Sequence, residues 1–194
     1  MNTSAHLIVA SAVLSRRDAP VRNRWIILGA LLPDLWIFVF FAWAGGVQGL
    51  PGETIWNETY WREPWQTIGA AFNSLPLATL IVAAGLAAKR TWLTVFGLAM
   101  TSHIALDLPL HGDDAHRHFW PLTDWRFISP VSYWDPAANG RWGNLIELGV
   151  VIAGSAILWR RFPRIWVRSL LGISVAASLV MAMVYWFMPL SAGP

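Results

Sequence analysis

The chain has 194 residues, of which 56% are apolar and only 13% are charged, and this balance points to a lipid bilayer because soluble domains carry about a quarter charged residues. Its 14 Lys and Arg residues form short clusters between apolar runs, which is typical of membrane topology signals and argues against a nucleic-acid partner. The absence of cysteine excludes disulfides, thiolate metal ligands and a cysteine nucleophile, and the length indicates a single integral membrane domain over 1–194.

The apolar segments predict an all-α, polytopic transmembrane bundle with about five spans. A spanning helix needs roughly 20 mostly apolar residues. The first segment, Thr3–Leu14, is too short to cross alone, and we expect it to pack as a half-span helix. The predicted spans then follow in chain order at Trp25–Ala44, Ile68–Ala88, Trp92–Leu110, Leu145–Trp159 and Ile165–Met188.

Basic residues between these segments predict the orientation of the bundle. With alternating spans, the clusters at 16–24, 89–90 and 160–168 fall on one side and hold ten of the 14 Lys and Arg residues. By the positive-inside rule this side is cytoplasmic, so segments 45–67 and 111–144 face outward.

The two outward segments contain half of the 14 tryptophans. One interpretation is an aromatic belt at the level of the lipid headgroups. The other is a lid over a site that binds a lipid or another amphipathic substrate. Several prolines in both segments favour fixed turns over disorder.

Asp34 lies halfway along the first predicted span, directly after Pro33. An ionised side chain at mid-helix costs about 2.5–3.5 kcal/mol on insertion scales, so it needs a partner. We expect Pro33 to open the helix locally, because proline leaves a backbone carbonyl without its donor. A protonated Asp34 could bond a neighbouring helix, but a carboxylate bound to a cation is favoured because the cation offsets the cost of burial.

The strongest local pattern is His103-x-x-x-Asp107-x-x-x-His111. Steps of four residues place side chains on one helical stripe, where imidazole and carboxylate can bind a divalent cation together. Pro109 is expected to break the helix before His111, so the first pair is the firmer prediction. Nitrogen and oxygen donors without sulfur make zinc the default metal. A polar loop that happens to be rich in histidine is the alternative for the residues that follow, which include His116 and His118.

His6 is isolated on an apolar helix, where a satisfied core histidine is as good an interpretation as a metal ligand. Asp114 and Glu58, in the two outward segments, are the candidates for a general base that takes a proton from water. Glu147 begins the fourth predicted span, where it would favour the positive end of the helix dipole.

Three short motifs, in this order, resemble the membrane-bound metal-dependent hydrolases of bacterial inner membranes. They are Ser4–Val9 with its early histidine, the Gly-x-Leu-x-Pro-Asp element at 29–34, and His103-x-x-x-Asp107. That family is distantly similar to zinc-dependent phospholipase C, an all-helical enzyme. The resemblance covers about the first 110 residues and implies a metal site formed by His6, Asp34, His103 and Asp107.

The chain departs from the family pattern at two places. Trp36 stands where a second acidic residue is common, and Asn73 and Ser74 stand in place of a histidine-rich element. Either His111, His116 and His118 complete the ligand set, or the site has lost activity.

These observations predict a metal-dependent hydrolase at the outer face of the bacterial inner membrane, with phosphoesters of lipids as the natural substrates. The alternative is a non-enzymatic membrane protein, either a metal or proton-coupled permease or a structural subunit of an assembly. A permease would place polar residues near mid-membrane on discontinuous helices. Here much of the His/Asp cluster continues into an outward loop, which favours surface chemistry.

Overall fold

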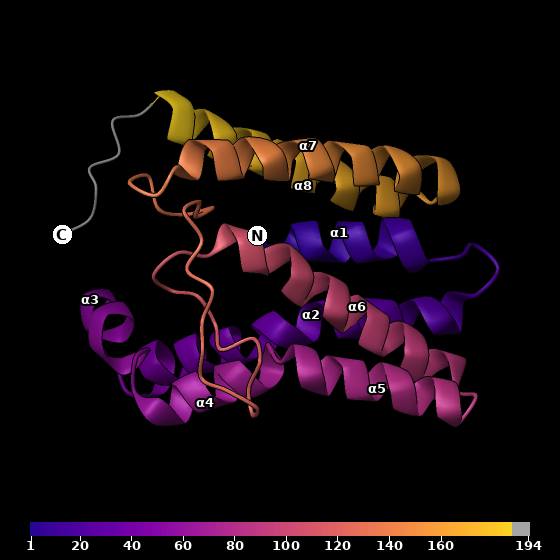
Figure 1. The fold of residues 1–194 in the computed structure, drawn as a ribbon. Coiled ribbons are helices and arrows are strands. Elements are labelled where there is room, and N and C mark those ends of the chain that lie inside the picture. The colour runs from indigo at the N-terminus through magenta and orange to yellow at the C-terminus, as the bar shows by residue number, and fades with distance from the viewer. Residues whose placement is uncertain (188–194) are drawn as a thin grey trace.

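The structure, a computed structural model, describes residues 1–187 and is a bundle of helices (Figure 1). Within these residues, five helical segments are long and apolar enough to cross a membrane: Pro20–Val47, Glu63–Ala87, Thr91–Leu110, Gly140–Arg161 and Ile165–Phe187. The prediction of a polytopic bundle with a short N-terminal helix is confirmed, and the fold fits a multi-pass membrane protein. Met188, the last residue of the fifth predicted span, lies outside the described residues.

The elements follow the predicted order, with two short insertions before the second span. They are α1 (Thr3–Leu14), α2 (Pro20–Phe41) with its π-helical continuation η1 (Ala42–Val47), α3 (Gly52–Thr54), the π-helical η2 (Ile55–Thr59), α4 (Glu63–Phe72), α5 (Leu75–Ala87), α6 (Thr91–Asp107), the 3₁₀ turn η3 (Leu108–Leu110), α7 (Gly140–Arg161) and α8 (Ile165–Phe187). The bounds of α1 agree with the prediction, and α7 extends beyond the predicted fourth span at both ends.

The second predicted span is two helices, not one. The chain breaks at Asn73 and Ser74, where the Ser74 hydroxyl accepts a hydrogen bond from the Leu77 amide at 3.1 Å and so caps α5. The Asn73 amide donates to the carbonyls of Pro33 and Gly69, each at 3.1 Å. A serine cap followed by a proline in the first turn is a usual start of a helix, and it outweighs the continuous apolar pattern here.

α2 continues through Pro33 to Phe41, so the expected local opening does not interrupt the helix. The carbonyl that Pro33 leaves without its usual donor is that of Gly29, four residues earlier. The carbonyl of Pro33 itself gains a bond from the Asn73 side chain. The bond therefore joins the middle of α2 to the break between α4 and α5.

Glycine allows α2 and α6 to lie in close contact. A Cβ at Gly29 would lie 2.2 Å from the Phe96 carbonyl oxygen of α6, so a larger residue would force the two helices apart. Small residues at such crossings are characteristic of membrane helices, whose backbones must approach closely to gain packing energy. This crossing brings the Asp34 face of α2 against α6.

α1 is a buried half-length helix between α2, α6 and α7 (Figure 1). On its α7 side, a Cβ at Gly154 would lie 2.6 Å from the Ile8 side chain. At its C-terminus, the Arg161 guanidinium donates to the carbonyls of Ser11 and Ser15, at 3.2 and 2.8 Å. An arginine at this end satisfies carbonyls that the helix leaves free. The other end of α1 lies inside the bundle, where Met1 is buried.

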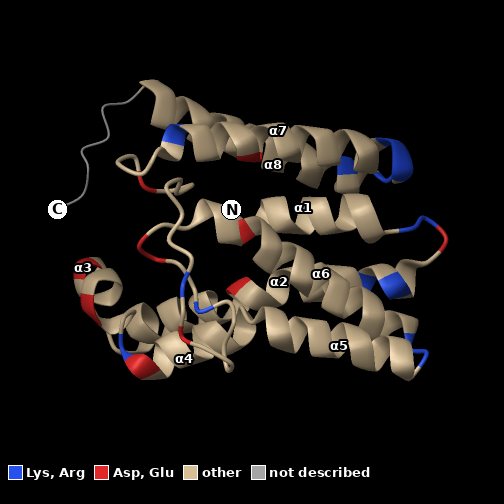
Figure 2. Ribbon diagram, in the orientation of Figure 1, with Lys and Arg blue, Asp and Glu red and all other residues tan. Residues whose placement is uncertain are grey.

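Figure 2 shows Lys and Arg gathered mainly at one end of the bundle, at the turns that join α1 to α2, α5 to α6 and α7 to α8. We call this the basic end. Acidic residues lie mostly in the other half of the molecule. The arrangement is the one that alternating spans require, while the assignment of the basic end to the cytoplasm stays a prediction.

Candidate metal centre

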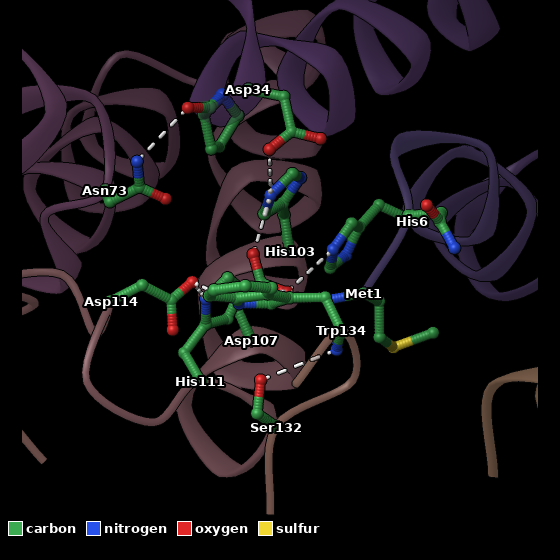
Figure 3. A network of polar contacts seen from close by, with 12 residues as sticks. Met1, His6, Asp34, Asn73, His103, Asp107, His111, Asp114, Ser132 and Trp134 are labelled. Atoms are coloured by element: carbon green, nitrogen blue, oxygen red, sulfur yellow. Dashed lines mark hydrogen bonds and ion pairs between the residues drawn. The ribbon is translucent and has the colours of Figure 1, made fainter. Parts of the chain in front are cut away.

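Side chains from α1 and α6 bring three potential metal ligands together inside the bundle (Figure 3). His6, His103 and Asp107 each offer a ligand atom, and these atoms lie within 4.8 Å of one another. All three residues are buried, with at most 2% of their surface exposed. Two imidazoles and a carboxylate, without sulfur, are a donor set that suits zinc and other divalent first-row metals.

His103 is held in the tautomer that a metal ligand needs. Its Nδ1 lies 2.7 Å from the Ala30 carbonyl oxygen of α2, and because a carbonyl can only accept, Nδ1 carries the proton. The other ring nitrogen, Nε2, faces the carboxylates and lies 3.0 Å from an Asp107 oxygen and 3.4 Å from an Asp34 oxygen. At this place Nε2 either carries a proton that it donates to the carboxylates or binds a cation between itself and them.

His6 reaches the same point from α1. Its Nε2 lies 2.9 Å from Asp107 Oδ1, and its ring stacks on the ring of His103 with centroids 3.5 Å apart and planes 10° apart. Sequence alone left the role of His6 open between core residue and ligand. The structure places it in the group of converging ligand atoms.

The carboxylates differ in their surroundings. Asp107 is 2% exposed and also accepts a bond from the amino group of Met1 at 2.5 Å. Asp34 is on the rim of the group, with 21% of its side chain exposed, and its second oxygen accepts a bond from the Thr3 hydroxyl at 2.5 Å. Asp34 is therefore the more accessible carboxylate, next to His103 but outside the tightest triad.

A cavity of about 280 Å³ adjoins this group. Its polar side is formed by residues that include Asp34, His111, Asp114 and His116, and its other side is largely aromatic. The aromatic lining is Trp36, Phe38, Tyr60 and Tyr133. Trp36 and Tyr60 stack with centroids 5.7 Å apart. The cavity thus combines a polar and an apolar wall.

His111 and Asp114 form a pair on the polar wall. His111 Nδ1 lies 2.6 Å from Asp114 Oδ2, and that oxygen also accepts a bond from the Trp134 indole at 2.9 Å. Burial lowers the pKa of His111, but the bonds to Asp107 and Asp114 outweigh it and raise this pKa to about 9. Burial likewise raises the pKa of Asp114, and the bond to His111 overcomes it and lowers this pKa.

Pro109 ends the regular helix before His111, as expected, through the 3₁₀ turn η3. Despite this break, His111 Nε2 comes back to within 3.5 Å of Asp107 Oδ1. His111 therefore borders the group of His6, His103 and Asp107. In the described part of the chain it does not itself belong to the residues whose ligand atoms lie within 4.8 Å of one another.

The other predicted residues lie farther from the triad. His116 lines the cavity, and burial lowers its pKa to about 3, so its ring is neutral. His118 Nδ1 lies 3.3 Å from the Asn73 carbonyl oxygen, and His118 is neither among the converging ligand atoms of residues 1–187 nor on the cavity wall. Glu58 is exposed on η2 and does not line the cavity over the same residues. The structure therefore gives Glu58 no place from which to act as the general base.

Glu147 has a role that its sequence position did not indicate. It is 1% exposed and accepts bonds from the Asn2 backbone amide at 2.9 Å and from the Asn2 side chain at 2.6 Å. The expected interaction with the dipole of its own helix is not its main contact. Glu147 instead fixes the start of α1, four residues before His6. The signal in the sequence that could have indicated this role is the position of Glu147 inside an apolar span, where an acidic side chain needs a partner.

No family model, curated protein or solved structure matches this chain. The function of the site is therefore argued from its own geometry and chemistry.

Proposed function

We propose that this protein is a metal-dependent hydrolase of phosphoesters, with membrane lipids as substrates and zinc as the metal. The observation that carries the proposal is the position of His103 Nε2, which faces two carboxylates inside a buried group. Metal-binding histidines typically donate their other ring nitrogen to a carbonyl, as His103 does to Ala30. The residues present therefore fit a divalent cation.

His6, His103 and Asp107 would hold the cation, and three protein ligands are the usual number for a catalytic zinc. When bound, such a cation supplies Lewis-acid activation of water and of a phosphoryl oxygen. Asp34 lies beside this group with its second oxygen held by Thr3, which orients the carboxylate toward His103.

The His111–Asp114 pair would supply a proton to the leaving group. A pKa of about 9 keeps His111 protonated at neutral pH, and Asp114 orients its ring through Nδ1, which leaves Nε2 directed toward Asp107. A histidine oriented in this way by a carboxylate is a common general acid–base arrangement. Of the two acidic residues that the sequence suggested as bases, Asp114 would therefore act by orienting His111.

We further propose that the protein belongs to a bacterial inner membrane with its basic end in the cytoplasm. The gathering of basic residues at one end of the bundle supports this orientation (Figure 2). The cavity then opens in the outward half of the bundle.

The test is the metal content of purified protein. We expect wild type to bind zinc, and we expect His103→Ala and Asp107→Ala to lose it. Glu58→Gln is the matched control, because Glu58 is exposed and outside the cavity, and it should keep wild-type zinc. A wild-type protein without zinc after exposure to the metal, or variants that retain it, would refute the proposal.

One observation favours the second candidate, a metal or proton-coupled permease. The break between α4 and α5 contacts α2 one residue from Asp34, so a discontinuous helix does lie beside the polar group. Zinc or proton uptake into proteoliposomes, abolished by Asp34→Asn, would support the permease. Hydrolysis of a soluble phosphodiester without uptake would support the hydrolase.

A further inference from the structure

The cavity beside the candidate metal centre reaches the outer surface of α2 at Phe38. Phe38 lines the cavity, and 52% of its surface is exposed. Phe41 lies on the same helix and is 50% exposed, but among the described residues it does not line the cavity. Because α2 belongs to a segment that is apolar and long enough to cross a membrane, we infer that the exposed surface of Phe38 faces lipid.

This place lies at the depth of the hydrocarbon region. Along α2, at 1.5 Å per residue, Asp34 is about 15 Å and Phe38 about 21 Å from Arg24, the last basic residue before the apolar stretch. The hydrocarbon core of a bilayer is about 30 Å thick. With Arg24 at the boundary, both residues lie inside the core, so the molecules next to Phe38 are acyl chains.

The size of the cavity limits what can be enclosed. Its volume of about 280 Å³ is at the lower limit of the roughly 300–1,000 Å³ found for small-molecule pockets. A lipid headgroup fits this space, whereas two acyl chains do not. A lipid bound here must leave its chains outside, and the wall at Phe38 borders the region where such chains are stable.

The lining matches such an occupant. Asp34 and His111 provide the polar side next to the candidate ligands, and Trp36 and Tyr60 provide an aromatic side. Thr3, the first residue of α1, and the two residues before it line the cavity as well. One end of the occupant is therefore polar and the other apolar.

We propose that a phospholipid reaches this cavity sideways from the bilayer, passing Phe38 between α1 and α2. Its headgroup lies beside Asp34 and His111, the glycerol end of its chains lies against Trp36 and Tyr60, and the rest of the chains remains in the membrane past Phe38. The inference rests on the proposed function for the reaction that follows, but the binding itself needs neither metal nor turnover.

The experiment uses a phosphatidylcholine with a diazirine in its acyl chain, close to the glycerol, in nanodiscs that contain the full chain. It is done in the presence of a chelator, and adducts are mapped by mass spectrometry after irradiation. We expect adducts on Trp36 and Tyr60, which are only 3% and 7% exposed and which bulk lipid cannot reach. Phe38→Gln places a polar amide in the path of the chain and should lower these adducts by about tenfold.

Phe41→Gln is the matched control, since it makes the same change one turn along the lipid-facing surface and should leave the adducts unchanged. Adducts confined to outer residues such as Leu80 and Ile173, or an equal loss in both variants, would overturn the lateral route. Because the chelated protein is used, these results are independent of zinc content and hydrolysis. A failure of the proposed function is therefore seen separately, in the metal analysis.

Discussion

Asp107 receives contacts from four groups on two segments of the chain: the Met1 amino group and His6 near the N-terminus, and His103 and His111 four residues before and after Asp107. A buried carboxylate with no compensating positive charge is strongly disfavoured, so these groups, together with the proposed cation, would share the neutralisation of its charge. Replacing Asp107 by a residue of the same shape but without charge is therefore expected to disturb the site.

We predict that Asp107→Asn lowers the affinity for zinc by more than about 100-fold, because it replaces a ligand and not merely a residue behind one. Isothermal titration with zinc measures the effect. Asp113→Asn makes the same change at an exposed neighbour and should retain wild-type affinity. Equal affinities for the two variants would remove Asp107 from the site.

A pH effect follows from the His111–Asp114 pair in the metal-free protein. The pKa of His111 is raised from its ordinary value of 6.5 to about 9, so the pair stabilises the fold fully below about pH 6.5. That contribution is lost as pH rises through about 9. We expect the thermal midpoint of chelated protein to fall between pH 7 and pH 10, and Asp114→Asn to make the fall smaller. A fall of the same size in the variant would show that another group is responsible.

At the scale of the elements, α1 matters most, because it carries His6 into the bundle without spanning it. Its two ends are fixed by α7, through Glu147 at Asn2 and through Arg161 at the last carbonyls. The close contact at Gly154 lies between them. The geometry of the candidate metal centre therefore depends on α7, a helix that contributes none of its three candidate ligands.

Glu147→Gln tests this dependence. It removes the charge from the bonds to Asn2, and the loss of charge-assisted bonds in a buried place should cost about 1–3 kcal/mol. We expect a lower thermal midpoint in detergent and a zinc affinity reduced by about 10-fold or more. Ser155→Ala is the control on the same helix, since its buried hydroxyl has no hydrogen-bond partner within residues 1–187. Unchanged zinc binding in Glu147→Gln would contradict the positioning role.

Gly29→Ala tests the crossing of α2 and α6. The added Cβ would lie 2.2 Å from the Phe96 carbonyl oxygen, so the helices must separate and the bond from His103 to Ala30 must lengthen. We expect a loss of stability of about 1–3 kcal/mol together with weaker zinc binding. Gly149 lies in α7, and a Cβ added there would have no atom of the described residues within 4 Å. Gly149→Ala should therefore be neutral or stabilising by up to about 1 kcal/mol. A tolerated Gly29→Ala would show that the crossing does not control the site.

The elements also show where sequence patterns were sufficient. The apolar runs predicted the bundle and the bounds of α1, because length and hydropathy are local properties. They did not predict the break at Asn73 and Ser74, where a cap competes with a continuous apolar pattern. The metal triad was predicted in part from i, i+4 spacing, whereas the contact of Glu147 with Asn2 and the aromatic wall depend on tertiary packing that spacing does not encode.

For the whole molecule, the distribution of charge is the property with a direct consequence. Basic residues lie mainly at one end, and the tryptophan-rich segments lie toward the other. The absence of cysteine makes the orientation measurable, because any introduced thiol is the only one.

We predict that Ala137→Cys is labelled by a membrane-impermeant maleimide in intact bacterial spheroplasts, and that Asp18→Cys is labelled only after lysis. Both positions are exposed, and they lie in opposite connecting segments of the bundle. The reverse pattern would invert the proposed orientation and place the cavity in the inner leaflet.

The attachment of α1 to α7 also bears on how the protein is made. α1 emerges first during synthesis but is too short to span, and the residues that hold both of its ends, Glu147 and Arg161, emerge more than a hundred residues later. His6 therefore joins His103 and Asp107 securely only once α7 has entered the membrane. Under the proposed function, zinc would be captured only after α7 has been made, and an incomplete nascent chain would not hold a reactive centre in the bilayer.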